Sequence, residues 1–203
     1  MAIKNIIFDF GGVVMDWNPR YFFKDYFKDD ERMEYFLKHI AEDAWNAEQD
    51  RGRTLKEGTE LQIRKFPDWE KELRAYYDNW TTMLKSDIPS NVAVLRKLGA
   101  TDYGMFGLTN WSAETFPYAL ENYDFFELFK DKIVVSGTEK LIKPDPKIWE
   151  LLMERYQLKP EESVFIDDNL KNIEVAQSLG FITIHLKENT NLEEELKALG
   201  LNF

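Results

Sequence analysis

Polar side chains that can handle a metal ion or a phosphate follow four short apolar stretches of this 203-residue sequence. Carboxylates bind divalent cations and attack phosphorus, whereas a lysine or a hydroxyl group neutralises or holds phosphoryl oxygens. In this order, the segments predict a site that holds a divalent cation and attacks a phosphoryl group with a carboxylate. They are Phe8-Asp9-Phe10-Gly11-Gly12, Leu108-Thr109-Asn110, Lys143-Pro144-Asp145-Pro146 and Ile166-Asp167-Asp168-Asn169.

Asp9 is the candidate nucleophile, because it ends an apolar stretch and two glycines follow closely. A carboxylate in this position can attack phosphorus in line and form an aspartyl-phosphate. Gly11 and Gly12 let the backbone approach an anion. The competing interpretation is an aspartate that only makes a turn at the end of a strand.

Asp167 and Asp168 are the most specific of these features, since adjacent carboxylates repel unless a cation or a helix N-terminus compensates them. Hard oxygen ligands close to a phosphate favour Mg²⁺. The competing interpretation is an acidic helix N-terminus before Leu170.

Thr109, Asn110 and Lys143 are candidates for holding the phosphoryl group. Lys143 stands in a Lys-Pro-Asp-Pro context that restricts its backbone, and it would neutralise charge on the phosphoryl oxygens. Taken alone, Thr109 and Asn110 are more typical of a helix cap than of a phosphate site.

The elements that must position these residues follow from hydrophobic periodicity. Short apolar strands alternate with helices after about residue 88, which predicts an α/β fold with a doubly wound, Rossmann-like parallel sheet. The carboxyl ends of parallel strands share one edge, where ligands bind. Expected strands are 3–8, 103–108, 132–136, 164–166 and 182–186; expected helices are 90–98 with Ser90 as N-cap, 113–122, 145–156, 170–179 and 191–199.

Residues 16–86 have a different character, with aromatic and aliphatic residues at helical spacing and no strand-like alternation. This pattern predicts three or four packed helices. We therefore expect a catalytic core of residues 1–15 and 87–203, with an all-helical cap of residues 16–86 inserted after the first strand. Trp80 is assigned to the cap core.

A charged turn around Gly52 is expected between two cap helices. If it faces the core, Asp50, Arg51 and Arg53 lie where a lid selects substrates, and either arginine would add a cation there. The competing interpretation is a solvated turn.

Composition narrows the classes of partner. The net charge of −11 argues against nucleic acid and anionic membranes. No cysteine is present, so thiol chemistry is excluded. No apolar stretch reaches the roughly 20 residues that span a bilayer, and a strand begins too early for a signal peptide. We expect a cytoplasmic monomer or homodimer that binds a small phosphorylated metabolite.

The four segments together resemble the haloacid dehalogenase superfamily, most of whose members are magnesium-dependent phosphatases. The resemblance extends over nearly the whole chain and includes the helical cap. It implies that Asp9 is the nucleophile and a Mg²⁺ ligand, with Asp168 and the carbonyl group of Gly11 as further ligands. It also implies that Asp167 binds the metal directly or through water, and that Thr109, Asn110 and Lys143 hold the phosphoryl group.

Gly11 departs from the pattern of most of these phosphatases, which carry an aspartate there as general acid and base. General acid–base catalysis contributes about 10²–10⁴-fold to the reaction rate. Its loss matters least for a leaving group that departs easily, such as an anomeric sugar oxygen. The segment from Phe8 to Asp16 also resembles the glucose-1-phosphatase-type branch, which shares the glycine. That resemblance implies a sugar phosphate substrate.

Two other functions remain open at this level. A 2-haloacid dehalogenase uses the same aspartate nucleophile without metal, and it needs an arginine near the cap entry, for which Arg20 is the candidate. The Asp167-Asp168 pair has no purpose in that reaction. The third possibility is a catalytically weak relative that binds a phosphometabolite, which only Gly11 supports.

Overall fold

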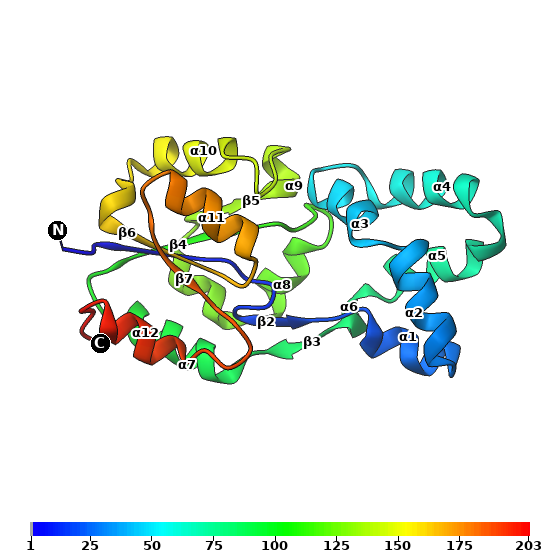
Figure 1. Ribbon diagram of the computed structural model, residues 1–203, viewed down its shortest axis with the longest axis horizontal. Helices are drawn as coiled ribbons and strands as arrows, with labels where there is room; N and C mark the ends of the chain where they lie inside the picture. Colours follow the sequence, from blue (N-terminus) through cyan, green and yellow to red (C-terminus); the bar gives the residue numbers. More distant parts are fainter. Residues whose placement is uncertain (1) are drawn as a thin grey trace.

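A five-stranded parallel sheet forms the centre of the computed structural model, which describes residues 2–203. The strand order is β5-β4-β1-β6-β7 (Figure 1). Phe8 of β1 pairs with Gly107 of β4 and with Ile166 of β6, so these three strands end at one edge of the sheet. The strands are β1 (Asn5–Phe8), β4 (Gly104–Thr109), β5 (Ile133–Val135), β6 (Ser163–Asp167) and β7 (Ile182–His185).

Helices cover both faces of the sheet, as the doubly wound prediction requires (Figure 1). Ile6 and Phe8 pack in one hydrophobic cluster with α7 (Pro89–Gly99) and α12 (Leu192–Ala198). Ile7 points to the opposite face and packs with α10 (Lys147–Tyr156) and α11 (Leu170–Ser178). Alternate side chains of a strand face opposite sides, so β1 is buried on both.

The inserted segment is a separate group of helices with its own aromatic core. Five α-helices precede the single turn of α6 (Trp80–Met83), which is more than the three or four expected. Phe23, Phe36, Trp45 and Tyr76 are buried at their centre. The helices are α1 (Arg20–Phe27), α2 (Asp30–His39), α3 (Asp43–Asp50), α4 (Leu55–Lys65) and α5 (Glu70–Asp78), with a 3₁₀ turn at Pro67–Trp69 between the last two.

A two-stranded antiparallel ribbon joins the cap to the sheet, and the periodicity analysis did not predict it. It consists of β2 (Met15–Trp17) and β3 (Leu84–Asp87). Strands of three or four residues are too short to show an alternating pattern. The ribbon crosses both expected boundaries, 15/16 and 86/87, and the division into core and cap stays a prediction.

Most other elements lie within a few residues of their expected bounds. Ile88 rather than Ser90 precedes α7, because Pro89 occupies the first helical position. The helix expected from residue 113 begins later, as α8 (Phe116–Asn122), and a single turn, α9 (Ser136–Glu139), follows β5. Within residues 2–203, no helix combines the length and apolar character needed to cross a bilayer.

Candidate active site

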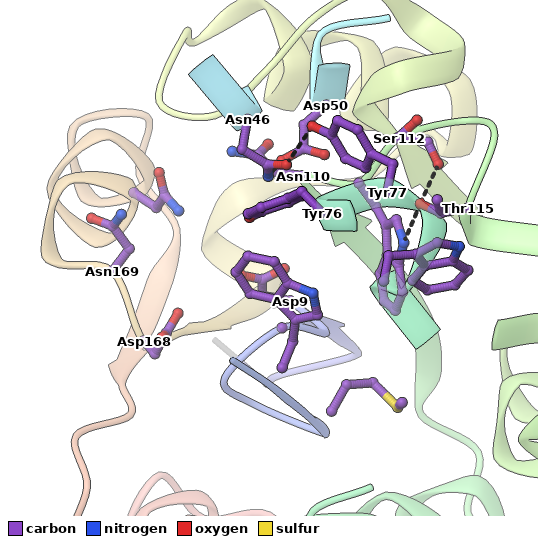
Figure 2. A pocket seen from close by; sticks show the side chains of 16 residues that line it. Asp9, Asn46, Asp50, Tyr76, Tyr77, Asn110, Ser112, Thr115, Asp168 and Asn169 are labelled. Atoms are coloured by element: carbon purple, nitrogen blue, oxygen red, sulfur yellow. Dashed lines mark hydrogen bonds between the residues drawn. The ribbon is translucent and has the colours of Figure 1, made fainter. Parts of the chain in front are cut away.

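Asp9 lies one residue beyond β1, at the carboxyl edge of the sheet (Figure 2). Asp9 is buried, with only 8% of the residue exposed. The backbone N–H of Phe10 donates a hydrogen bond to Asp9 Oδ1 at 2.7 Å, and Lys143 Nζ lies 3.0 Å from the same oxygen. These contacts hold the carboxylate in one orientation at the base of a cavity.

Lys143 bridges two carboxylates and is fully buried. Its ammonium group lies 2.6 Å from Asp167 Oδ2 and donates to the carbonyl oxygen of Leu108 at 2.9 Å. Burial alone lowers the pKa of Lys143, but Asp167 and Asp9 outweigh burial and raise it above its usual value. Lys143 therefore stays charged and orients Asp9.

Asp167 and Asp168 are adjacent but have different surroundings. Asp167 is 0% exposed, and the side-chain amide of Asn172 donates to both of its oxygens at 3.0 Å. The N–H of Asn169 donates to Asp167 Oδ1 at 2.8 Å. Asp168 is exposed and lines the cavity (Figure 2). Of this pair, Asp168 is the acid open to a ligand, whereas Asp167 holds Lys143.

Three carboxylates converge where the sequence predicted a metal site. One oxygen each from Asp9, Asp167 and Asp168 lies within 4.8 Å of the others. Burial raises the pKa of Asp9 to about 8, with further increases from Asp167 and Asp168 that Lys143 partly offsets. Burial and Asp167 also raise the pKa of Asp168. This concentration of hard oxygen donors is suited to a magnesium ion.

Gly11 and Gly12 shape the other side of this acidic cluster. Gly11 lines the same cavity as Asp9 and Asp168. Gly12 has a φ of +71°, and a Cβ atom there would clash with the carboxylate of Asp168. A side chain at Gly12 is thus excluded both by its backbone conformation and by the acid beside it.

Thr109 ends β4 and Asn110 follows it, at the sheet edge where they were predicted, but the two side chains make different contacts. Thr109 is 0% exposed, and its hydroxyl has no hydrogen-bond partner within residues 2–203. Asn110 donates to the carbonyl oxygen of Lys143 at 3.0 Å and accepts from the N–H of Lys143 at 2.9 Å. Asn110 thereby positions the Lys143 segment, and contact of Thr109 or Asn110 with a phosphoryl group stays a prediction.

A cavity of about 260 Å³ opens above Asp9, between the sheet edge and the cap (Figure 2). Sequence reasoning missed its aromatic walls and assigned Trp80 to the cap core. The only signal available in the sequence was that Trp17 and Trp80 lie near the two expected boundaries between core and cap, 15/16 and 86/87. The aromatic lining residues are Trp17, Tyr76, Tyr77, Trp80 and Trp111.

The three arginines proposed for the substrate region do not line this cavity. Arg20 forms a bidentate ion pair with Glu34, at 2.6 and 2.7 Å, on the exposed surface of the cap. Arg51 lies 3.6 Å from Glu48, and Arg53 donates to Gln49 Oε1 at 2.7 Å. Of the residues considered in the turn around Gly52, only Asp50 reaches the cavity.

Comparisons with known proteins find relatives along nearly the whole chain. Residues 3–180 match the haloacid dehalogenase-like hydrolase family. A sesquiterpene phosphatase of Aspergillus oryzae is 28% identical over 201 residues, which is 98% of this chain and 97% of that protein. A D-ribitol-5-phosphate phosphatase of Bacteroides thetaiotaomicron is 26% identical over 214 residues, with 97% and 98% covered.

The fold is also similar to solved structures. A haloacid dehalogenase family enzyme from Bacteroides thetaiotaomicron, crystallised with magnesium and inorganic phosphate, has a TM-score of 0.72 and 26% sequence identity. The similarity covers 96% of this chain and 99% of that one. The match extends over both the sheet and the cap.

Proposed function

Since this chain belongs to the haloacid dehalogenase-like hydrolase family, we propose that it is a magnesium-dependent hydrolase of phosphate monoesters. The observation that carries this proposal is the convergence of Asp9, Asp167 and Asp168, with Lys143 between the first two. The relatives named above as phosphatases, and the similar structure that holds magnesium and phosphate, support it.

In the first step, a carboxylate oxygen of Asp9 attacks phosphorus in line, a P–O bond to Asp9 forms and the ester P–O bond breaks. The ammonium group of Lys143 orients Asp9 and favours its ionised form, which partly offsets the rise that burial causes in the pKa of Asp9. The departing alcohol oxygen takes a proton from solvent, because Gly11 has no side chain to supply one. A water molecule then attacks the aspartyl-phosphate and releases inorganic phosphate, which restores Asp9.

Asp9, Asp168 and the carbonyl group of Gly11 would hold the magnesium ion, with Asp167 binding directly or through water. When bound, the ion supplies positive charge to the phosphoryl oxygens. Thr109 and Asn110 are proposed to hold the phosphoryl group. The cap would limit the access of bulk water to the cavity.

The proposed substrate is a small phosphorylated metabolite such as a sugar phosphate. The glycine at position 11 favours a substrate whose alcohol departs easily. One relative is named as a phosphatase of a phosphorylated sugar alcohol, D-ribitol 5-phosphate. The position of Arg20 does not support a 2-haloacid dehalogenase function, because the guanidinium group of Arg20 is paired with Glu34 outside the cavity.

The proposal is tested with a panel of phosphorylated metabolites, with and without Mg²⁺, and with chloroacetate as the dehalogenase control. We expect phosphate release that disappears with a chelator and falls by about 10³-fold or more in Asp9→Asn, which has no nucleophilic carboxylate. Unchanged turnover in Asp9→Asn, or chloride release that survives the chelator, contradicts the proposal. Binding of inorganic phosphate without turnover of any compound would instead favour a phosphometabolite-binding protein.

A further inference from the structure

The cap wall of the cavity above Asp9 is aromatic and carries an acid rather than a base. No lysine or arginine is among the lining residues in the described part of the chain. The one cation beneath the cavity, Lys143, is already bonded to Asp9 and Asp167. A second anionic group on a substrate would therefore find no positive partner on this wall.

Asp50 is the acid on this wall. It ends α3, and Figure 2 shows Asp50 and Asn46 entering from the cap side, with Asp9 and Asp168 on the side of the sheet. The side-chain amide of Asn46 donates to Asp50 Oδ2 at 3.1 Å. Ser136 donates to the backbone carbonyl oxygen of Asp50, which anchors this residue to α9. Asp50 is half-buried, and no salt bridge joins it to a base in residues 2–203.

We propose that the cavity selects phosphate monoesters whose alcohol part is uncharged, and that Asp50 rejects alcohol parts carrying a carboxylate or a second phosphate. This inference rests on the proposed phosphatase function and adds the class of substrate. Two like charges that lie several ångströms apart in a partly desolvated cavity repel each other, and this repulsion lowers the binding affinity by about tenfold or more. The aromatic faces suit the C–H faces of a sugar, a polyol or a hydrocarbon chain alike.

The charge of Asp50 changes near neutral pH. Burial raises the pKa of Asp50 to about 7, and the backbone N–H of Ser112 opposes this by favouring the ionised form. Rejection of anions should therefore be weak at pH 6, where the carboxyl group is mostly protonated, and strong at pH 8.

The titratable groups near Asp50 include two tyrosines, an arginine and a glutamate. Burial raises the pKa values of the Tyr76 and Tyr77 phenols on α5, so both stay neutral. Arg53 is held by Gln49 Oε1 and the carbonyl oxygen of Trp45. Glu114 accepts from the N–H of Leu55. Asp9 lines the same cavity and its pKa is raised to about 8, so the part of the pH dependence that Asp50→Asn removes is the part assigned to Asp50.

The test compares glycerol 3-phosphate with 3-phosphoglycerate, which differ by a hydroxymethyl group in place of a carboxylate. Both are measured as competing inhibitors of hydrolysis of the best compound from the metabolite panel. At pH 8, the inhibition constant of the wild-type protein should be about tenfold or more higher for 3-phosphoglycerate. Asp50→Asn, which keeps the shape and removes the charge, should bring the two constants within about threefold.

Glu48→Gln is the matched control, because it removes one negative charge from the exposed side of the same helix. It should leave the ratio of the two constants unchanged. The ratio should rise between pH 6 and pH 8 in the wild-type protein. It should rise much less in Asp50→Asn, where Asp9 still gains charge on the sheet side of the cavity but Asp50 is absent. The phosphate groups of the two compounds titrate alike, so their own protonation cancels in the ratio.

Equal inhibition of the wild-type protein by both compounds at pH 8 overturns the proposal. So does a ratio that Asp50→Asn leaves unchanged. The comparison of the two compounds at pH 8 in the wild-type protein requires no variant, so equal inhibition overturns the proposal even if Asp50→Asn folds poorly. Failure of the phosphatase proposal is distinct, because it appears as turnover that survives in Asp9→Asn or as no phosphate release at all.

Discussion

Gly11 and Gly12 are neighbours in the sequence, yet only Gly12 has to be glycine for steric reasons. A Cβ atom at Gly11 would meet no heavy atom within 4 Å, whereas one at Gly12 would meet the carboxylate of Asp168. Gly11 also lies outside the positive-φ region that Gly12 occupies. The absence of a general acid two residues after Asp9 is therefore a chemical property of this site, because the fold has room for a side chain there.

Gly11→Asp should improve the hydrolysis of simple alkyl phosphates. The new carboxyl group enters open space beside Asp9 and can protonate a poor leaving group, which is worth about 10²–10⁴-fold in favourable geometry. We expect kcat/KM for an alkyl phosphate to rise by about tenfold or more, with a smaller change for a sugar 1-phosphate. If both substrates respond equally, the argument from leaving groups is wrong.

Gly12→Ala should weaken the metal site while the protein stays folded. The added methyl group displaces the carboxylate of Asp168 and forces a non-glycine residue to a φ of +71°. The Mg²⁺ concentration for half-maximal activity should rise by about tenfold, in the range found when the surroundings of a metal ligand are disturbed. Activity titrated with Mg²⁺ measures this shift, and an unchanged midpoint would remove Asp168 from the metal site.

At the scale of elements, two contacts decide how the cap meets the sheet. The β2–β3 ribbon joins them covalently at one side. At the other side, the end of α3 lies against α9, where the Ser136 hydroxyl accepts from the N–H of Trp111 at 2.9 Å and donates to the carbonyl oxygen of Asp50. Ser136 is 0% exposed, so this hydroxyl connects a sheet loop to a cap helix without competing water.

Ser136→Ala should destabilise the protein and loosen the cavity wall that carries Asp50. It leaves a buried N–H and a buried carbonyl group without their partner, which costs about 1–3 kcal/mol of unfolding free energy. Chemical denaturation measures that loss, and the KM for the best substrate should rise more than kcat falls. Ser178→Ala is the control, because the Ser178 hydroxyl bonds only to Val175 within its own helix and is exposed. Equal losses in the two variants would contradict this role of Ser136.

At the scale of the whole molecule, residues 2–203 contain three hydrophobic clusters rather than one. Two lie on opposite faces of the sheet and separate Ile6 and Phe8 from Ile7. The third lies inside the cap, around Phe23 and Phe36. The cavity has walls from both the sheet and the cap, so its shape depends on the stability of a cap core that contains none of the proposed catalytic residues.

Phe36→Ala should cost about 3–5 kcal/mol of unfolding free energy, because it leaves a void in a fully buried aromatic cluster. Substrate affinity should fall along with stability, since Tyr76 and Tyr77 of the cap line the cavity. The neighbouring Tyr35 is 53% exposed, and Tyr35→Ala should cost no more than about 1 kcal/mol. Denaturant unfolding followed by circular dichroism measures both variants, and equal costs would mean that the cap core contributes little to stability.

The sequence alone determined the sheet, most of its helices and the residues that gather at its edge. Asp9, Thr109 and Asp167 each follow an apolar stretch, and parallel strands place such residues side by side whatever the intervening chain does. Family membership followed from the same short segments. These features depend on local periodicity and on strand ends, which a sequence shows directly.

Only the tertiary structure decided how those residues are used. Asn110 bonds to the backbone of Lys143, and Lys143 bonds to Asp9 and Asp167. These residues lie 24 to 134 positions apart in sequence, and the directions of their side chains depend on packing. The β2–β3 ribbon is too short to show a periodicity. Tyr76, Tyr77 and Trp80 of the cavity wall lie on helices and have the same spacing as the cap core. Whether such a side chain faces a core or a cavity depends on which surface lies opposite it, and for Trp80 and Asp50 that surface comes from a distant part of the chain.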